Sequence, residues 1–492
     1  MTNHILALDF GTSIDRAGLY RHMEDPVPVE TVKNDRLLTS TQDGGFEIDA
    51  DEAFDQAVQA IDDLLKKASV TAISHCAISC FWHSLMGIDE RGNPTTKLFA
   101  WAETRPAKYV DELKLAFDES TYHNRTGCRF HSMYWSAKLL WLRKDFPAQF
   151  KATAKWISFS DYFALKTLAT NNLPVTSVSI ASGTGIFDLR KNLWDKELLD
   201  FLEIDEEKLP QIANDGETYR LNKKFAKQWK KLVDAKWFNA IGDGAANNIG
   251  AGCFVKNKLA IMIGTSGAMR TAFIGEPPAQ IPAGLFCYRI DRKSIVIGGA
   301  LSDGGGLYHW LKDNFRLNND DDETEKEIAK RSPFGHGITF LPFFAGERST
   351  GFHDFARGAI IGLRTAHDNI DVVQAALEAV AFRFADIFDQ LSEVVDIEQI
   401  IASGGALRES PVWTQIISDV IGRELDLPDT REASSRGVIL LAAKYLNRLK
   451  DISAIETPPG KAFYPNQAAN EKYLTARKIH EGYYRMLLNP QK

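Results

Sequence analysis

The sequence lacks the features that mark several classes of protein. It has no apolar run approaching the roughly 18 residues that a membrane span needs. It has no tract of clustered lysine and arginine, and its formal net charge is −7, so a nucleic-acid partner is disfavoured. The chain begins directly with a strand pattern, so we expect no signal peptide. These absences favour a folded soluble protein.

Cysteine is also scarce. The five cysteines are odd in number, scattered and mostly inside apolar runs: Cys76, Cys80, Cys128, Cys253 and Cys287. This pattern favours buried reduced thiols over a metal site or a set of disulfides. We therefore expect the cytosol as the compartment.

What is present indicates two domains of α/β class. A chain of 492 residues is too long for one hydrophobic core. Strand and helix patterns alternate, are interrupted by the glycine-rich stretch "IGDGAANNIGAG", and then alternate again. We place the domain boundary near residue 250, between an N-terminal domain of residues 1–250 and a C-terminal domain of residues 251–492.

One short pattern occurs in both halves. "ILALDFGTSIDRAGLY" begins at Ile5, and "LAIMIGTSGAMRTAFI" begins at Leu259. Each has an apolar run, Gly-Thr-Ser, a basic residue and a second apolar run, which predicts a hairpin. Such a turn directs several backbone N–H groups one way and adds a hydroxyl donor, which suits a phosphate chain. One copy is common in plain hairpins, but two copies could hold a nucleotide from opposite sides.

Only the first copy carries a carboxylate. Asp9 stands where the second copy has Met262. Mg²⁺ keeps most of its water shell and takes one or two carboxylates, so one metal site needs only one such residue. Asp9 is therefore the predicted metal residue, and the alternative is a local turn cap.

Helices are predicted from apolar periodicity and from end signals. One begins near Asp51, and a long one covers "NIDVVQAALEAVAFRFADIFDQL". "SPVWTQIISDVIG" has Ser410 as N-cap, Pro411 in the first turn and Gly422 at the end. The charged stretch 185–240 is also interpreted as helical.

Taken in order, the motifs resemble the FGGY family of carbohydrate kinases, within the actin-like ATPase superfamily. "DFGTS" and "IGTSG" resemble its two phosphate motifs, and "GDGAANNIGAG" its catalytic segment. "GGALSDGGGLYHWL", "FLPFFAGERSTGFHDFARGAIIGL" and "ASGGALRESPVWTQIISDVIGREL" resemble its later motifs. The resemblance implies two related ribonuclease H-like (actin-like ATPase) domains around a central cleft.

The resemblance assigns the nucleotide side of that cleft. It implies ATP and Mg²⁺ as cofactors, with Asp9 at the metal. The residues implied for ATP and its phosphates are Gly11, Thr12, Ser13, Arg16, Gly264, Thr265, Gly305, Gly404, Gly405 and Ala406. Glycine at such positions lets the backbone approach a flat base or ribose closely.

The resemblance gives the role of general base to Asp243. Phosphoryl transfer to an alcohol needs a positioned hydroxyl, charge neutralisation and a base. Asp243 lies in a Gly-Asp-Gly turn, from which its carboxylate can project into a cleft. Considered alone, Asp243 fits a helix N-cap better than a catalytic role. The second phosphate turn begins about twenty residues later, as in the family, and this spacing favours catalysis.

The sugar side is predicted from two loops. The residues implied for the substrate, besides Asp243, are Trp82, His83, Trp101, Glu103 and Arg105. Arg105 could bind a sugar-acid carboxylate in a bidentate way, or could instead pair with Glu103. The chain departs from the family pattern on this side, with Phe81 and Trp82 before His83 and with Glu103 in place of the expected Asp.

These residues predict an ATP-dependent kinase of a small sugar or sugar acid. "FWHSLMGID" and "FAWAETR" look most like gluconate kinases, with xylulokinases next. Xylulose or ribulose is the alternative substrate. The alternative of another class is a nucleotide-switched binding protein on the same scaffold. The sequence leaves the oligomeric state open, with a homodimer among the options.

Overall fold

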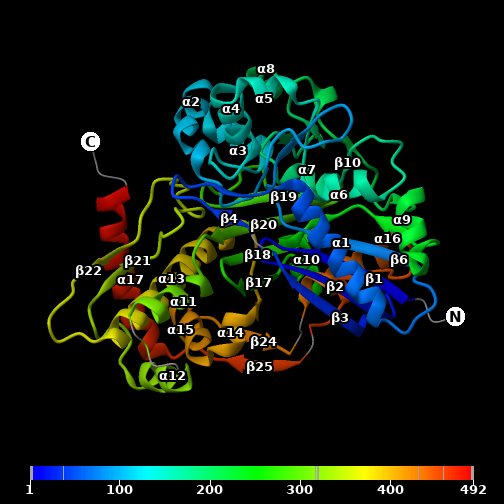
Figure 1. Cartoon of the computed structure of the whole chain (residues 1–492). Coiled ribbons are helices and arrows are strands. Elements are labelled where there is room, and N and C mark those ends of the chain that lie inside the picture. Colours follow the sequence, from blue (N-terminus) through cyan, green and yellow to red (C-terminus); the bar gives the residue numbers. More distant parts are fainter. Residues whose placement is uncertain are drawn as a thin grey trace.

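The computed structural model describes residues 4–36, 38–315, 317, 321–429, 432–457 and 459–488. Within these ranges, two seven-stranded mixed sheets are each covered by helices (Figure 1). The predicted α/β class is confirmed. All five cysteines are buried free thiols. No helix in the described ranges combines the length and the apolar character that crossing a membrane requires.

The N-terminal sheet has the order β14-β15-β6-β1-β2-β3, with β16 also paired to β6. Its strands are β1 (His4–Phe10), β2 (Ile14–Arg21), β3 (Val27–Asp35), β6 (His75–Cys80), β14 (Thr218–Tyr219), β15 (Lys236–Phe238) and β16 (Ile241–Gly242). The predicted first hairpin is therefore the β1–β2 pair.

The C-terminal sheet has the order β19-β20-β18-β17-β23-β24-β25. Its strands are β17 (Lys258–Ile263), β18 (Gly267–Ile274), β19 (Phe286–Asp291), β20 (Ser294–Leu301), β23 (Gln399–Ser403), β24 (Leu425–Pro428) and β25 (Gly460–Phe463). The second predicted hairpin is the β17–β18 pair.

The two sheets share one plan. In the first sheet, β2 pairs antiparallel with both β1 and β3. On the other edge of β1, the sheet continues with β6 and then β15, and these strands pair in parallel. In the second, β17, β18 and β20 form the antiparallel part, and β23 and β24 continue it in parallel. The repeated sequence pattern is thus the first hairpin of a repeated sheet.

Helices surround both sheets. Those of the N-terminal half are α1 (Ala50–Lys67), α2 (Val110–Ala116), α3 (Glu119–Thr126), α4 (Trp135–Asp145), α5 (Pro147–Ala152), α6 (Phe159–Thr167), α7 (Val178–Ser182), α8 (Lys196–Leu202), α9 (Lys223–Gln228) and α10 (Asp243–Gly250). Those of the C-terminal half are α11 (Gly305–Asn314), α12 (Asp321–Lys330), α13 (Asn369–Ser392), α14 (Gly405–Glu409), α15 (Pro411–Ile421), α16 (Ala433–Tyr445) and α17 (Gln467–Leu488).

Short strands complete the loops. They are β4 (Thr39–Ser40), β5 (Phe46–Ile48), β7 (Met86–Ile88), β8 (Leu98–Phe99), β9 (Lys155–Ile157), β10 (Val175–Thr176), β11 (Phe187–Asp188), β12 (Leu193–Trp194), β13 (Gln211–Ile212), β21 (Thr339–Leu341) and β22 (Ala359–Ile361). The interpretation of residues 185–240 as helical is wrong, because short strands and turns separate its two brief helices, α8 and α9.

The helices with clear end signals form as predicted. Asp49 caps α1 by accepting hydrogen bonds from the backbone N–H groups of Asp51 and Glu52. Ser410 caps α15 by accepting from the Trp413 N–H, and Gly422 ends the helix in the left-handed conformation. These local signals suffice because each satisfies backbone groups that a helix end leaves unpaired.

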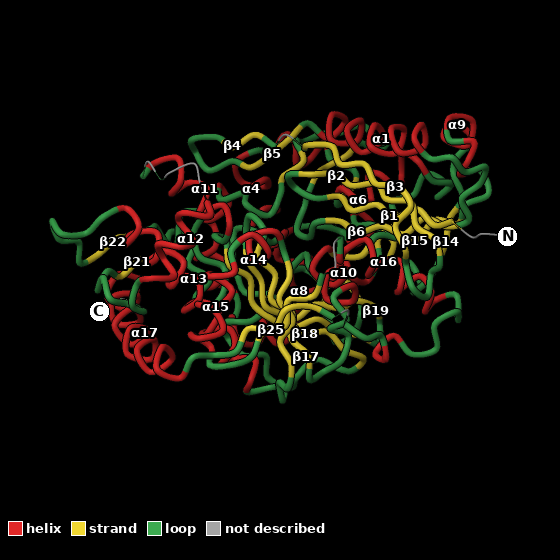
Figure 2. The backbone as a smooth tube through the Cα atoms, turned by 90° about the horizontal axis from the view of Figure 1, so that it is seen from below, coloured by secondary structure: helices red, strands yellow, loops and turns green. Residues whose placement is uncertain are grey.

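Helices α10 and α16 cross between the two sheets (Figure 2). Their backbones meet at two glycines. A Cβ atom at Gly250 would lie 1.8 Å from the carbonyl oxygen of Ala433, and one at Gly437 would lie 1.8 Å from that of Ala246. No larger residue fits at either position, so the crossing is a backbone-to-backbone contact.

Candidate active site

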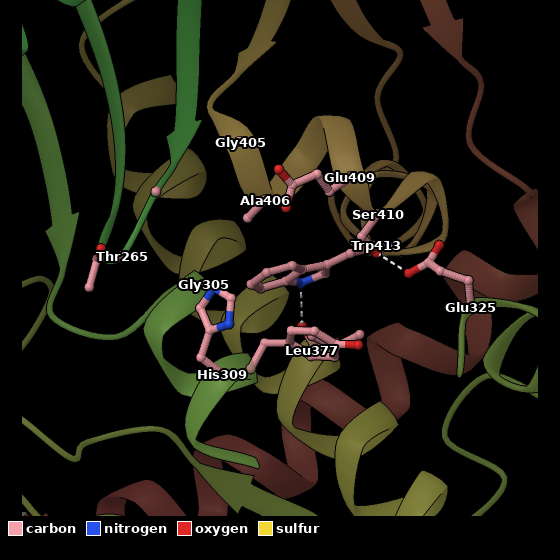
Figure 3. A pocket seen from close by; sticks show the side chains of 12 residues that line it. Thr265, Gly305, His309, Glu325, Leu377, Gly405, Ala406, Glu409, Ser410 and Trp413 are labelled. Carbon is pink, nitrogen blue, oxygen red and sulfur yellow. Dashed lines mark hydrogen bonds between the residues drawn. The ribbon is translucent and has the colours of Figure 1, made fainter. Parts of the chain in front are cut away.

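The second Gly-Thr-Ser turn forms one wall of a cavity of about 280 Å³. Five predicted nucleotide residues line it together: Gly264, Thr265, Gly305, Gly405 and Ala406 (Figure 3). The N–H of Gly305 donates to the Gly264 carbonyl at 2.8 Å. Gly404 lies just behind, with φ +99°, and a Cβ atom there would stand 2.2 Å from the Ile263 carbonyl oxygen. Glycine is therefore required where these backbones meet.

The rest of this cavity combines aromatic and apolar side chains with the polar side chains of Glu325, Glu409 and Ser410. Trp413 extends into it beside Leu377 and His309 (Figure 3), and its indole N–H donates to the Leu377 carbonyl at 3.1 Å. Glu325 accepts from the Ser410 hydroxyl and, at 3.0 Å, from the Val412 N–H. The cavity therefore offers flat apolar surface beside a glycine-rich backbone. Sequence reasoning missed Trp413, because the periodicity of α15 explains it fully as a core residue.

The first turn carries a charged cluster. The N–H of Gly11 donates to the Ile14 carbonyl at 3.1 Å, and Thr12 and Ser13 are accessible to solvent. Arg16 contacts Asp9 through Nη1 at 3.2 Å and Glu432, from the C-terminal half, through Nε at 3.0 Å. Gly11, Thr12 and Ser13 line neither cavity described here.

Asp9, the predicted metal residue, is a buried carboxylate beside Arg16. It is 7% exposed, and burial raises its pKa to about 6 against the opposing effect of Arg16. The charge of Asp243 raises it further. Among the described residues no group of three His, Cys, Asp or Glu side chains could hold a metal by itself. This arrangement fits Mg²⁺, which uses one or two carboxylates and completes its shell with water and substrate phosphates.

Asp243 is the first residue of α10, directly after β16. It is not the N-cap, a position that Gly242 occupies, and its Oδ1 accepts from the Gly244 N–H at 2.8 Å. A Cβ at Gly242 would lie 1.8 Å from the Trp82 indole, and one at Gly244 would lie 1.6 Å from Nη1 of Arg270. The two glycines thus let Trp82 and Arg270 pack on either side of the carboxylate. Burial raises the pKa of Asp243, and Arg270 opposes the shift.

A second cavity, of about 80 Å³, lies beside Asp243. Four predicted substrate residues line it together: Trp82, His83, Trp101 and Asp243. Other side chains in its lining come from later in the chain and were not predicted: Tyr134, Arg270, Tyr288 and Arg348. Arg348 lies in the "GERST" part of a motif that resembles the family, and that motif was used without assigning a role to its individual residues.

His83 is fixed as a neutral ring. It has φ +68°, and its Nδ1 donates to the Gly183 carbonyl at 2.5 Å. Burial lowers the pKa of His83 to about 3. Lys138, fully buried, donates at 2.7 Å to the carbonyls of both His83 and Ala100. Lys138 thereby ties together the two loops that supply His83 and Trp101.

Glu103 and Arg105 do not line the cavity, contrary to the expectation that they contact the substrate. Glu103 is 0% exposed and Arg105 binds it through Nε and Nη2, each at 2.7 Å. Arg105 also pairs with Glu47. Of the two alternatives for Arg105, the structure contains the ion pair, because a buried carboxylate requires a cation.

Comparison with known proteins decides the family. Residues 4–250 match the N-terminal domain of the FGGY family of carbohydrate kinases, and residues 259–446 match its C-terminal domain. The chain belongs to the FGGY family. As an FGGY kinase it is an ATP-dependent phosphotransferase with an alcohol acceptor, acting on a sugar, and the alternative of a binding protein without turnover is set aside.

Relatives of this FGGY kinase share its whole length. A gluconokinase from Bacillus subtilis (strain 168) is 28% identical over 504 residues, which cover 99% of this chain and 97% of that protein. Crystal structures of a gluconate kinase and of a ligand-bound xylulose kinase, both from Lactobacillus acidophilus, each have a TM-score of 0.89 at 26% identity and cover 99% of both chains. The actin-like architecture of two domains is confirmed. Since the two structures are equally similar, they do not distinguish a sugar acid from a ketose.

Proposed function

We propose that this kinase phosphorylates a sugar acid, with D-gluconate as the substrate and Asp243 as the general base. The proposal rests chiefly on the place of Asp243. Its carboxylate shares one cavity with three predicted sugar residues and with Ser266 and Gly267 of the second phosphate hairpin. A hydroxyl bound there lies between a base and the turn that would hold the phosphates.

The proposed reaction follows from these positions. Asp243 accepts the proton of the attacking sugar hydroxyl. At the same time the hydroxyl oxygen bonds to the γ-phosphorus of ATP, and the bond between that phosphorus and the bridging oxygen of the leaving ADP breaks. A pKa raised by burial makes this carboxylate a better proton acceptor than an ordinary Asp. Backbone N–H groups of the two turns would hold the phosphates, and Trp413 would cover the base. Asp9 would hold Mg²⁺ through water, and the ion would supply neutralisation of phosphate charge.

The choice of gluconate has two supports. The matched relative from Bacillus subtilis is a gluconokinase. The sugar cavity also contains two arginines, Arg270 and Arg348, against the single carboxylate of Asp243. A ketopentose such as xylulose or ribulose is the second candidate, because one of the two equally similar structures is a xylulose kinase.

Measurement of ADP release over a substrate panel tests the proposal. The panel contains D-gluconate, D-xylulose, D-ribulose and glycerol at matched concentrations, with ATP and Mg²⁺. We expect the highest kcat/KM for D-gluconate. A higher value for either ketopentose would transfer the assignment to that sugar.

Two further expectations remain proposals. A cytosolic location is supported by the five free, buried thiols. A homodimer can be checked by light scattering of the purified chain.

A further inference from the structure

The charges of the sugar cavity do not balance. Its lining contains two guanidinium groups, Arg270 and Arg348, and one carboxylate, Asp243, while His83 is neutral. With Asp243 ionised, one positive charge is left over. A charge in a partly buried cavity is costly unless it is paired, so the surplus cation calls for an anionic ligand.

Arg270 is the arginine with the stronger electrostatic effect on Asp243, although the two form no ion pair within the described residues. It is 5% exposed, packs against Gly244 and opposes the rise that burial causes in the pKa of Asp243. It projects from β18, directly after the phosphate turn. Its charge therefore offsets that of the catalytic aspartate.

Arg348 is the surplus cation. It lies in the loop between β21 and β22, with its guanidinium stacked on Trp101 at 4.5 Å from the ring centroid. Nη2 donates to the Leu301 carbonyl, and the buried Nε has no hydrogen-bond partner. Among the described residues Arg348 forms no ion pair, and Asp243 and Asp303 lie beyond ion-pair distance. Burial lowers the pKa of Arg348 only to about 10, so it stays charged at neutral pH.

The neighbours of Arg348 hold it in place. Glu347 is 1% exposed and accepts from Arg383, from the Tyr484 hydroxyl at 2.9 Å and from the Gly351 N–H at 3.1 Å. On the other side, the Ser349 N–H donates to the Ala300 carbonyl at 2.9 Å, and its hydroxyl accepts from the Ala300 N–H at 3.0 Å. With both neighbours anchored, Arg348 is presented to the cavity in one orientation, which lowers the entropic cost of binding.

We propose that Arg348 is the specificity-determining residue that binds the carboxylate of the sugar acid. The inference rests on the proposed function and refines it. Stacking on Trp101 fixes the plane of the guanidinium, and its unused N–H groups match a carboxylate, which Arg binds in a bidentate way. Arg105, the cation nearest in sequence, is already held by Glu103 and Glu47.

A matched pair of substrates separates this role from contact with the γ-phosphate. D-gluconate and D-gluconamide share every hydroxyl and differ only at C1, where an uncharged amide replaces the carboxylate. In the wild-type enzyme we expect a higher kcat/KM for gluconate. Arg348→Gln should lower kcat/KM for gluconate by roughly 10- to 150-fold, the range for loss of a charge-assisted hydrogen bond. The change for gluconamide should stay within about threefold, and the KM for ATP should not change.

Two other variants complete the test. Arg348→Lys keeps the charge without the planar fork, so it should reduce the gluconate-to-gluconamide ratio partly, and it serves if the glutamine variant does not fold. Arg105→Gln should lower the melting temperature without changing that ratio. Equal losses on both substrates, or an unchanged ratio in a folded Arg348 variant, would overturn the inference. Failure of the proposed function is seen separately, as a wild-type enzyme that prefers a ketopentose to gluconate.

Discussion

The two Gly-Thr-Ser hairpins share a sequence pattern but differ in register. In the first, Phe10 pairs with Asp15 and four residues lie between them. In the second, Ile263 pairs with Gly267 and only three residues intervene. Because directly opposed residues lie on one face of a sheet, a turn shorter by one residue changes which side chains meet.

This difference places the two arginines differently. Arg16 lies opposite Asp9 and binds it. In the second hairpin the residue opposite Met262 is Ala268, and Arg270 lies farther from the turn, opposite Ala260. Arg270 therefore has no acidic partner in its own hairpin and packs beside the turn that carries Asp243. The two hairpins thus share the Gly-Thr-Ser sequence and differ in the charges around it.

The largest expected effect concerns a residue in neither hairpin. If proton transfer belongs to Asp243, Asp243→Asn should reduce kcat by at least about 10²-fold, since general bases contribute roughly 10²–10⁴-fold. Binding of ATP, measured by calorimetry, should persist. Turnover close to that of the wild type would remove Asp243 from the mechanism.

The next largest effect tests whether Asp9, the carboxylate that the first hairpin has and the second lacks, holds the metal. Asp9→Asn should raise the Mg²⁺ concentration for half-maximal activity by roughly 10- to 100-fold, as expected for a residue that holds a metal through water. Asp15→Asn is the matched control, because Asp15 is a buried aspartate of the same hairpin whose partner is Arg36. The control should lower the melting temperature and leave the Mg²⁺ requirement unchanged. An equal Mg²⁺ shift in both variants would argue against a metal role for Asp9.

A smaller effect tests whether both turns hold one nucleotide. Thr12→Val and Thr265→Val each remove a hydroxyl donor and should each cost about 1 kcal/mol in kcat/KM for ATP. In the double variant we expect a coupling of about 0.5 kcal/mol or more, because the residues would share a ligand. Additive losses, or a loss from one turn alone, would mean that the second turn is only structural.

The smallest expected effect concerns the ion pair between Arg16 and Glu432. Glu432 binds Arg16 and, at 2.5 Å, also Lys33, so phosphates must compete with it for Arg16. Glu432→Gln should lower the KM for ATP by roughly two- to fivefold, the range for a partly exposed ion pair of up to about 1 kcal/mol. A higher KM would instead show that Glu432 orients Arg16 productively.

Local signals predicted part of this molecule well. The two hairpins and helices α13 and α15 follow from periodicity, caps and turn chemistry, all set by neighbouring residues. Residues 185–240 were misread because their short strands depend on partners elsewhere in the chain, as when β13 pairs with β10 and β15 with β6.

The sugar site was predicted less completely for a similar reason. Arg105 is near the substrate loop in sequence, yet Glu103 and Glu47 hold it away from the cavity. Arg348 is distant in sequence and reaches the cavity through a loop of the other half. Only the fold shows that Arg105 is already paired with carboxylates, whereas Arg348 is not.

The glycine crossing of α10 and α16 has a mechanical consequence. Because Gly250 and Gly437 carry no Cβ, the backbones of α10 and α16 approach each other closely at this point. The Arg436 guanidinium also donates to the Gly250 carbonyl across the crossing. If one half rotates about this fixed point, the displacement of any atom grows with its distance from the axis. A change of a few degrees at the crossing is therefore amplified at the far rim of the molecule, so the aperture between the halves can vary while both sheets stay rigid.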